Sequence, residues 1–155
     1  LDCLLAANVG GAAELSGSGL HWEKLPPLPN PAGLGSPYAG VGDGALLVAG
    51  GANFPEAPPW AGGKKRWYDT VYALSDARGG WKEGGKVIRP MGYGVSATAP
   101  GGVVCAGGSD LARHYRDAFL LRLAGGGLET KVLPPLPRPM ARRRARRPRR
   151  LFPRG

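Results

Sequence analysis

A double glycine ends two short apolar runs of this chain, and the segments around the two pairs recur in the same order. The pairs stand at residues 50–51 and 107–108, so that they are 57 residues apart. A polar loop and a second apolar segment follow each pair, the latter at 70–74 and 118–121. A fixed order of segments at a regular period is the sequence signature of a repeat protein.

Each repeat then finishes with a closing segment that leads into prolines. Trp81-Lys82-Glu83 closes the first repeat and residues 128–130 close the second, while residues 21–25 resemble a third closing segment ahead of both. The proline-bearing stretches after them are Leu-Pro-Pro-Leu-Pro at 25–29, Ile-Arg-Pro at 88–90 and Leu-Pro-Pro-Leu-Pro again at 133–137.

The repeat predicts one four-stranded antiparallel blade of a β-propeller. Its apolar runs are short, rich in β-forming residues and bounded by Gly, Pro and Asp, which indicates strands rather than helices. Paired glycines suit a strand end where backbones crowd near a central axis, and we expect the late Trp or Leu to pack between neighbouring blades. The spacing resembles the kelch repeat, whereas another antiparallel sandwich with Gly-rich turns is the alternative.

The predicted fold class is therefore all-β, with about two kelch-type blades in residues 20–140 and the closing strand of a further blade. A propeller usually needs four to eight blades. The chain is expected to be a fragment, because the next Gly-Gly would fall at about residues 156–160 on the same spacing. Missing blades or an oligomer would be needed to close the ring.

Arginines are concentrated in the last residues and account for most of the net charge of +10. Residues 141–155 contain eight arginines and no acidic residue. Such a tail could bind phosphates through counterion release, or it could be solvated and disordered. We favour a third interpretation, an out-of-frame translation, because the arginines begin where a Gly- and Ala-rich strand is due. Nucleic acid is therefore not an expected partner.

Other compositional features exclude several classes of function. Residues 1–19 have a short apolar stretch followed by small residues, which fits either a disordered terminus or the end of a secretory signal without its basic part. No segment is long enough to span a membrane. Cys105 stands in an apolar strand, where a buried, unreactive thiol is expected, and Cys3 lies in the N-terminal segment. The chain has neither paired Cys nor paired His at metal-ligand spacing, so we expect no metal and no cofactor.

The candidate ligand-binding loops follow the two Gly-Gly pairs, and we expect them to leave the inner strands of the blades. The first loop, residues 52–69, is rich in polar and aromatic side chains of the kinds that bind sugars: Asn for hydroxyls, Trp for stacking and Lys for a carboxylate. Glu56 is its only acid before Asp69 and is a conceivable proton carrier, although a loop-surface role is favoured. The second loop spans residues 109–117, and Tyr93 precedes an inner strand between the two loops.

In combination, these motifs resemble the cyclically permuted mutarotase family, kelch propellers related to bacterial N-acetylneuraminate epimerase. The matching motifs are Gly-Gly-Ala-Asn-Phe-Pro, Pro-Trp, Gly-Lys-Lys, Tyr-Gly-Val-Ser and Gly-Gly-Ser-Asp, and the resemblance covers about residues 21–140. It implies a six-bladed, exported propeller, periplasmic or secreted, that interconverts anomers of sialic acid. The alternative is a kelch module that binds a protein or glycan without catalysis.

The resemblance also indicates candidate site residues. The family's catalytic Glu and Arg are expected in a blade beyond this chain, and Ser109 stands in place of that Glu, so no catalytic residue is assigned. Lys64 and Tyr93 are the first candidates for contact with a sialic-acid-like sugar. Below them come Asn53, Asp110 and Arg113, the last two of which could instead pair across a tight turn.

Overall fold

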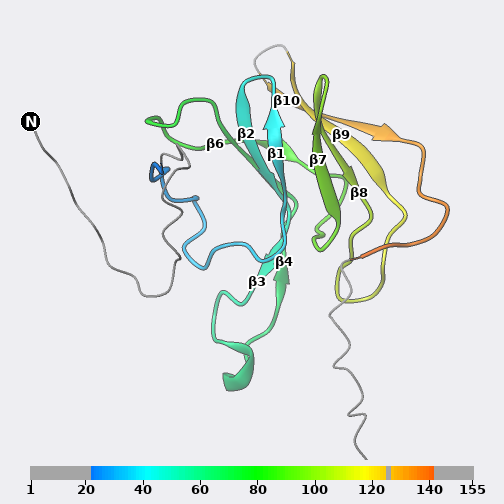
Figure 1. The fold of residues 1–155 in the computed structure, drawn as a ribbon. Helices are drawn as coiled ribbons and strands as arrows, with labels where there is room; N and C mark the ends of the chain where they lie inside the picture. The colour runs from blue at the N-terminus through cyan, green and yellow to red at the C-terminus, as the bar shows by residue number, and fades with distance from the viewer. Residues whose placement is uncertain (1–21, 125–126, 142–155) are drawn as a thin grey trace, which may run out of the picture.

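The computed structural model describes residues 22–124 and 127–141, and these residues form two four-stranded antiparallel sheets that lie side by side (Figure 1). The first sheet, blade 1, has the strand order β1-β2-β5-β6, and the second, blade 2, has the order β7-β8-β9-β10 when read from its first strand. Blade 1 comprises β1 (Tyr38–Gly42), β2 (Ala45–Ala49), β5 (Thr70–Leu74) and β6 (Lys82–Lys86). Blade 2 comprises β7 (Val95–Ala99), β8 (Gly102–Ala106), β9 (Ala118–Ala124) and β10 (Gly127–Leu133).

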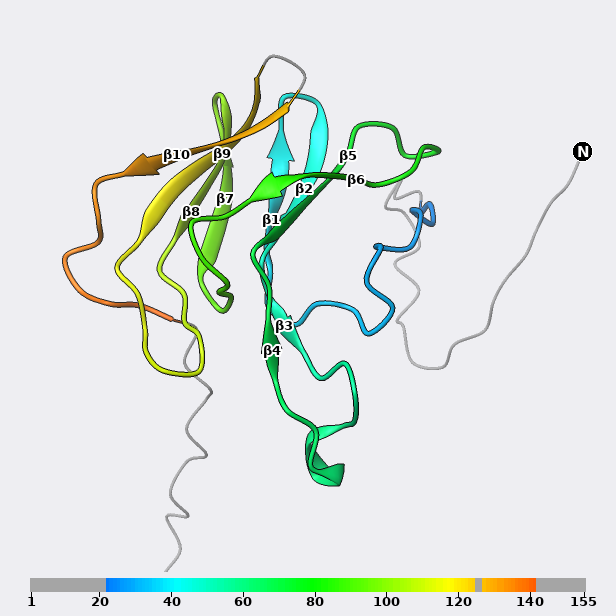
Figure 2. The same cartoon turned by 180° about the vertical axis from the view of Figure 1, so that it is seen from behind.

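A small two-stranded ribbon extends from blade 1. Its strands, β3 (Ala52–Asn53) and β4 (Arg66–Trp67), belong to the loop between β2 and β5, and the short 3-10 helix η1 (Pro59–Ala61) lies at the far end of that loop. The ribbon projects beyond the ends of both sheets (Figure 2).

The predicted repeat is confirmed down to the register of the strands. In blade 1, Tyr38 pairs with Ala49 across β1 and β2, and in blade 2, Val95 pairs with Ala106 across β7 and β8. Both pairings are shifted by the same 57 residues that separate the Gly-Gly pairs. The apolar runs of the sequence form β2, β5, β8 and β9, as expected.

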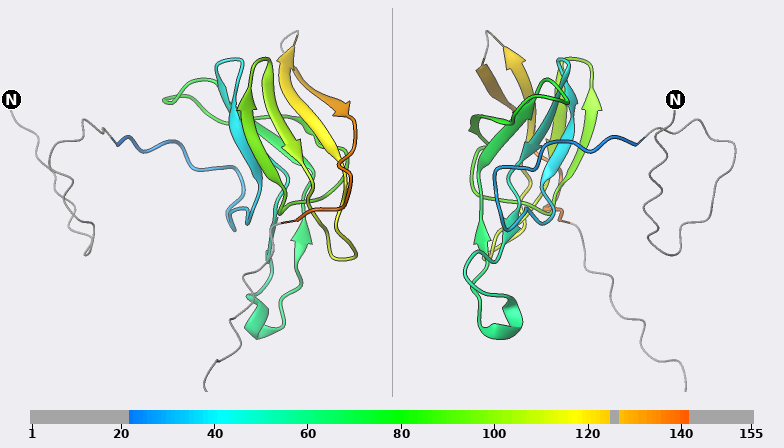
Figure 3. Two further views of the ribbon diagram at one scale, coloured as in Figure 1. Left: turned by 45° about the vertical axis from the view of Figure 1, so that its right-hand side comes forward. Right: turned by 90° about the vertical axis from the view of Figure 1, so that its left-hand side faces the viewer.

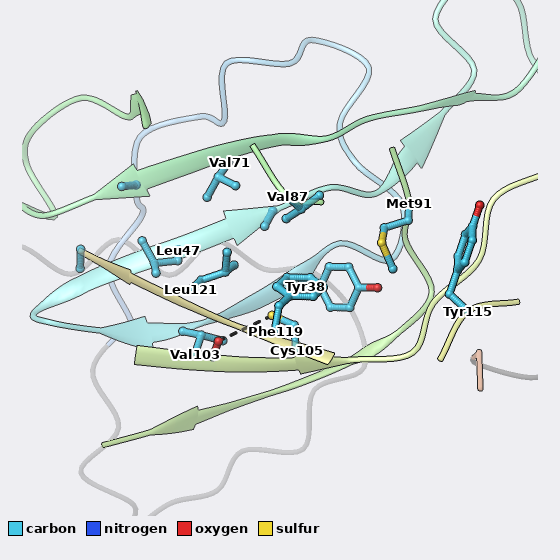
Figure 4. Packing of buried hydrophobic residues seen from close by; sticks show 13 residues of the cluster. Tyr38, Leu47, Val71, Val87, Met91, Val103, Cys105, Tyr115, Phe119 and Leu121 are labelled. Atoms are coloured by element: carbon cyan, nitrogen blue, oxygen red, sulfur yellow. Dashed lines mark hydrogen bonds between the residues drawn. The ribbon is translucent and has the colours of Figure 1, made fainter. Parts of the chain in front are cut away.

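The hydrophobic core lies between the two blades (Figure 4). Tyr38 of β1 packs edge-on against Phe119 of β9 with ring centroids 5.4 Å apart, and its hydroxyl donates to the carbonyl of Gly107 at 2.7 Å. Cys105 is fully buried in this core, as predicted, and burial raises the pKa of its thiol to about 12. The fully buried side chains of the core are Tyr38, Leu47, Val71, Met91, Val103, Cys105, Phe119 and Leu121.

Each Gly-Gly pair attaches the segment that ends its blade. Gly51 N–H donates to the carbonyl of Met91 at 2.8 Å, and Gly108 N–H donates to the carbonyl of Met140 at 2.6 Å. The first glycine of each pair has a φ near +65° and no room for a side chain, because a Cβ on Gly50 would overlap the Met91 carbonyl oxygen. The crowding expected at the paired glycines is therefore present. Its source is the exit strap, the segment that leads from the last strand of each blade to Met91 or Met140.

The position of these pairs corrects one expectation about the loops. The inner strands are the first strands of the sheets, β1 and β7, which lie side by side and are joined by a hydrogen bond from Ala39 N–H to Ser96 Oγ at 3.0 Å. The Gly-Gly pairs instead end the second strands, β2 and β8. The loop after each pair therefore joins the second strand to the third and does not leave an inner strand.

The outer strands show how the closing segments pack. Leu128 of β10 lies against Gly84 and Gly85 of β6, so the late Leu packs between the blades as predicted. The closing segment expected at 21–25 is not a strand where it is described, because residues 22–28 pair with no other strand. Trp81 nevertheless contacts it, since its indole N–H donates to the carbonyl of Pro26 at 2.9 Å.

The two ends of the described chain lie on different sides of the molecule. Residues 22–34 run along the side of blade 1 that faces away from blade 2, and residues 134–141 return beneath blade 2 (Figure 3). Residues 1–19 and, apart from Ala141, the arginine-rich segment lie outside the described residues. Within the described ranges, no helix has the length and apolar character needed to cross a bilayer.

Candidate functional site

Side chains from the β3–β4 ribbon and from the entry to β7 meet at one end of the two blades. Lys65 directly precedes β4, Trp67 ends it, and Tyr93 stands two residues before β7. The ribbon belongs to blade 1 and Tyr93 to blade 2, so the meeting point bridges the two repeats. We refer to Lys65, Trp67 and Tyr93 as the aromatic–lysine cluster.

The Lys65 ammonium group lies between two aromatic rings. It donates to the hydroxyl of Tyr93 at 2.6 Å and lies 4.2 Å from the centroid of the Tyr93 ring and 4.6 Å from that of Trp67. The two rings contact each other edge to face, with centroids 5.5 Å apart. A cation over an aromatic face is attracted by the ring quadrupole, so the cluster holds a positive charge at a fixed, half-buried position.

Two features of this cluster have a cost that the surrounding packing must offset. Tyr93 has a φ of +64°, a region that non-glycine residues rarely adopt, and its N–H is fixed by the carbonyl of Ser36 at 2.9 Å. The indole N–H of Trp67 is buried and has no hydrogen-bond partner among the described residues. A strained backbone and an unsatisfied buried donor are both enriched at functional sites.

Lys64, one of the two first candidates, does not join this cluster. Its side chain is exposed and makes no hydrogen bond or ion pair in the described part of the chain, whereas the adjacent Lys65 is half-buried against Tyr93. Lys65 and Trp67 were not among the predicted site residues. The available signal was the alternation of a strand, since residues two apart lie on the same face and Lys65 and Trp67 are two apart.

Asn53 is buried and its amide group is fully engaged inside the protein. The amide nitrogen donates to Asn30 Oδ1 at 2.9 Å and to the carbonyl of Gly33 at 2.7 Å, and the amide oxygen accepts from the Tyr68 hydroxyl at 2.9 Å. These bonds tie the segment before β1 to the ribbon. The sugar-binding role predicted for Asn53 stays a prediction, and its partners here are all structural.

Asp110 organises the turn that follows the second Gly-Gly pair. Its carboxylate accepts from the backbone N–H groups of Ala112 at 2.8 Å and Arg113 at 3.0 Å, and from the hydroxyl of Tyr115 at 2.5 Å. The Tyr115 hydrogen bond is the largest of the causes that lower the pKa of Asp110 below its usual value. Asp110 and Arg113 are thus linked across a tight turn, although through the backbone of Arg113 and not its side chain.

The guanidinium groups of two arginines lie over the ring of Tyr115 on this turn. Arg89 lies 4.7 Å from the ring centroid and Arg113 lies 5.2 Å from it. Arg89 Nε also approaches Asp117 Oδ2 at 2.9 Å, which links blade 1 to the strand entering β9. Of the predicted site residues on this turn, Arg113 therefore contacts Tyr115 and is otherwise exposed.

Neither the loop acid nor a metal cluster adds chemistry to this end of the molecule. Glu56 is exposed at the rim of an open hollow of about 420 Å³ that residues 53–59 line together with Ala32. Throughout residues 22–124 and 127–141, no group of three or more His, Cys, Asp or Glu is arranged to hold a metal ion. The aromatic–lysine cluster brings together one cation, two aromatic rings and an unpaired donor, which suits an anionic ligand with hydroxyl groups and apolar faces.

Repeated four-stranded sheets around a shared inner edge, each held by a Gly-Gly pair, define two blades of a kelch-type β-propeller. The solved structure of YjhT has a similar fold, with a TM-score of 0.65 at 23% identity over 75% of this chain and 36% of that chain. The family model described as N-acetylneuraminate epimerase matches residues 4–130. The chain belongs to the N-acetylneuraminate epimerase family.

Individual relatives agree with this assignment. The chain is 38% identical to N-acetylneuraminate epimerase of Brucella suis over 127 residues, which is 72% of this chain and 32% of that protein. It is 40% identical to N-acetylneuraminate epimerase of Salmonella enteritidis over 106 residues, 59% of this chain and 27% of that protein. The chain spans about a third of the length of the curated relatives it matches.

Proposed function

We propose that this chain supplies two blades of the sugar-binding end of a propeller that acts on the anomers of N-acetylneuraminate or a closely similar acidic sugar. The observation that carries the proposal is the aromatic–lysine cluster, in which Lys65 Nζ is held 2.6 Å from the Tyr93 hydroxyl beside an unpaired Trp67 N–H. Family membership supplies the class of ligand.

The chemistry of the cluster suits such a ligand. An acidic sugar presents a carboxylate, hydroxyl groups and ring C–H faces. The Lys65 ammonium can pair with the carboxylate, and the aromatic faces can stack on the C–H groups. Because Lys65 is already fixed by Tyr93, little side-chain entropy remains to be lost on binding.

We further propose that the two blades bind the sugar without catalysing its interconversion. Opening and reclosing a hemiketal needs a proton donor and acceptor beside the ring oxygen and the anomeric hydroxyl. The cluster contains no carboxyl group, Glu56 is exposed on the loop, and Asp110 accepts three hydrogen bonds within its own turn. The remaining groups would come from further blades of a six-bladed ring.

The chain would then form part of that ring, and it spans about a third of the length of the relatives it matches. Its location outside the cytoplasm, periplasmic or secreted, is part of the same proposal. A kelch module that binds a glycan or protein without any chemistry is the second candidate. The exposed Pro- and Trp-bearing tip of the first loop, where the Trp60 side chain is 87% exposed, is the feature that favours it.

Titration of the chain with N-acetylneuraminic acid, followed by two-dimensional NMR, tests the binding site. We expect chemical-shift changes centred on Lys65, Trp67 and Tyr93. Lys65→Met should raise the dissociation constant about tenfold, the effect of losing one charge-assisted hydrogen bond. Lys64→Met is the matched control, because it removes the same charge from the adjacent residue, whose side chain is exposed. Equal effects of the two substitutions would contradict the proposed site.

Exchange spectroscopy on the same samples separates the two candidate functions. If the chain binds without catalysis, the rate of exchange between the two sugar anomers stays at its uncatalysed value while the cluster resonances shift. An accelerated exchange that Lys65→Met abolishes would show that two blades suffice for catalysis. Binding of neutral glycans at the Trp60 loop, with no shift at the cluster, would favour the non-catalytic module instead.

A further inference from the structure

The backbone around Tyr93 is held on both sides of that residue. On one side, Gly92 N–H donates to the carbonyl of Ser109 at 3.1 Å, and the Gly92 carbonyl accepts from the Ser109 N–H at 2.7 Å. On the other side, a Cβ added to Gly94 would overlap the ring of Tyr38 and lie 2.6 Å from its hydroxyl oxygen. A left-handed φ at a residue other than glycine persists only where its surroundings over-determine it. These contacts therefore help to hold Tyr93 at its φ of +64°.

Tyr38 is itself fixed in the core between the two blades. Its side chain is fully buried, its ring packs edge-on against Phe119, and its hydroxyl donates to the carbonyl of Gly107. A Cβ on Gly108 would overlap the same hydroxyl oxygen. The ring therefore occupies the space that side chains at Gly94 and Gly108 would need, and it links the core of the blade interface to the entry of β7.

The two repeats differ at the position of this tyrosine. Tyr38 pairs with Ala49 across β1 and β2, and Val95 holds the equivalent position 57 residues later, where it pairs with Ala106. The first strand of a blade thus accepts a valine here, so its pairing alone does not require an aromatic ring. The tyrosine stands in the strand beside the Tyr93 segment, where its ring reaches the backbone next to the strained residue.

We propose that Tyr38 is a positioning residue of the sugar-binding site, which sets the Tyr93 backbone and through it the place of the Lys65 ammonium group. The inference rests on the proposed function, because it assigns a role within the same site. The contacts run from the Tyr38 ring to Gly94, along the chain to Tyr93, and from the Tyr93 hydroxyl and ring to Lys65 Nζ at 2.6 Å and 4.2 Å. They cross from blade 1 to blade 2 and return to blade 1, so the position of Lys65 depends on how the blades pack.

Loss of the Tyr38 ring should release this arrangement. Leucine is shorter than tyrosine, so Tyr38→Leu keeps an apolar side chain in the core but leaves Gly94 without its neighbour. Because a positive φ is unfavourable for tyrosine, we expect Tyr93 to relax and its ring to move away from Lys65. The lysine would then regain side-chain freedom that binding must remove again. Tyr38→Phe keeps the ring and should keep the arrangement.

NMR shifts of the Lys65 side chain test the proposal without any sugar. The ε-methylene group carries the ammonium between the rings of Tyr93 and Trp67, so ring currents displace its proton resonances. We expect Tyr38→Phe to retain this displacement and Tyr38→Leu to lose most of it. Leu121→Ala is the matched control, because it removes a fully buried side chain from the same core and should retain the displacement. An unchanged displacement in Tyr38→Leu, or an equal loss in Leu121→Ala, would overturn the proposal.

A second variant reaches the same contact with every core side chain in place. Gly94→Ala puts a methyl group against the Tyr38 ring and the Ala106 carbonyl, so it should shift the adjacent Tyr93 and reduce the displacement at Lys65. Gly80→Ala is its control, because no atom lies within 4 Å of the added Cβ. If Tyr38→Leu does not fold, a normal Lys65 signal in Gly94→Ala is the result that rejects the positioning role.

Titration with N-acetylneuraminic acid then connects the position of Lys65 to binding. Tyr38→Leu is expected to raise the dissociation constant about tenfold, whereas Tyr38→Phe and Leu121→Ala should stay within about twofold. Since Tyr38 acts through Lys65, adding Tyr38→Leu to Lys65→Met should change the constant by less than about twofold, and full additivity would contradict this path. If the Lys65 signals respond as expected but the unmodified chain does not bind the sugar, the proposed function fails while the positioning of Lys65 by Tyr38 stands.

Discussion

Single residues at the Gly-Gly end of the blades divide into those that hold the turn and those that remain available to a ligand. The polar side-chain atoms of Asn53 and Asp110 are hydrogen-bonded to neighbouring backbone and side-chain groups. Lys65 and Tyr93 bond to each other, and both contact the ring of Trp67. The difference follows from local geometry: Asn53 and Asp110 each stand two residues after a Gly-Gly pair, where polar groups of the same loop or of the segment before β1 lie within hydrogen-bond reach.

Asp110 provides a pH-dependent test of this division. A lowered pKa means that the carboxylate stabilises the folded turn above the ordinary pKa, and that this contribution is lost as the pH falls through the lowered value. In an NMR titration of its carboxyl carbon, we expect Asp110 to show a pKa below the ordinary value of 3.8. Tyr115→Phe removes only the hydroxyl and should move the midpoint upward. An unchanged midpoint would mean that the backbone N–H groups alone hold the turn.

At the scale of elements, each blade is an antiparallel sheet whose second strand is fastened to the exit strap by its glycine pair. The equivalent hydrogen bonds recur in both blades: Gly50 to Thr70 and Gly107 to Asp117, then Gly51 to Met91 and Gly108 to Met140. The repetition explains why glycine is needed twice at each place. The first glycine has no space for a Cβ, and both have a positive φ.

Substitution of these glycines should separate steric crowding from backbone preference. Gly50→Ala is expected to lower the free energy of unfolding by about 3 kcal/mol, because its Cβ would overlap the Met91 carbonyl as well as occupying the left-handed region. Gly44→Ala is the control: φ is +76° and no atom lies within 4 Å of the added Cβ. It should cost only about 1 kcal/mol. Urea unfolding measures both, and equal losses would contradict the crowding.

The elements of the fold were largely predictable from the sequence, whereas the contacts of the site were not. Apolar runs, turn residues and the repeat give the strands and their order, because these are local or periodic signals. Which of two adjacent lysines turns inward is decided by the side on which β4 presents it, and that depends on the pairing of Ala52 with Trp67. The position of the ribbon relative to Tyr93 depends on the packing of one blade on the next, which no local pattern encodes.

At the scale of the whole molecule, the two blades share one core and several hydrogen bonds that cross between them. Tyr38 O–H donates to Gly107, Leu123 N–H donates to Asp43 at 2.9 Å, and the hydroxyl of Thr130 donates to Lys86 at 3.0 Å. These contacts run from the inner strands to the outer ones. Each blade buries its facing residues only through the other, as expected for neighbouring repeats.

The shared core predicts that the two blades unfold together. Tyr38→Phe leaves the Gly107 carbonyl without its donor and is expected to lower the free energy of unfolding by about 1 to 2 kcal/mol. Native-state hydrogen exchange should show this loss equally for the amides of β2 and β8. Glu129→Gln, which affects only an exposed ion pair with Arg122 inside blade 2, should change neither by more than about 0.5 kcal/mol. A loss confined to β8 would mean that the blades open separately.

The exit strap of each blade also marks the boundary at which one repeat could be duplicated or exchanged as a module. Both backbone hydrogen bonds of Met91 go to blade 1, to Tyr68 and Gly51, whereas both of those of Gly92 go to Ser109 of blade 2. The division between repeats therefore falls at a single peptide bond, well after the last outer strand. A gene duplication or an exchange of blades that cut the chain after β6 would separate a blade from the carbonyl that its glycines need. A crossover at the codons for residues 91 and 92 would keep every such bond within its own module.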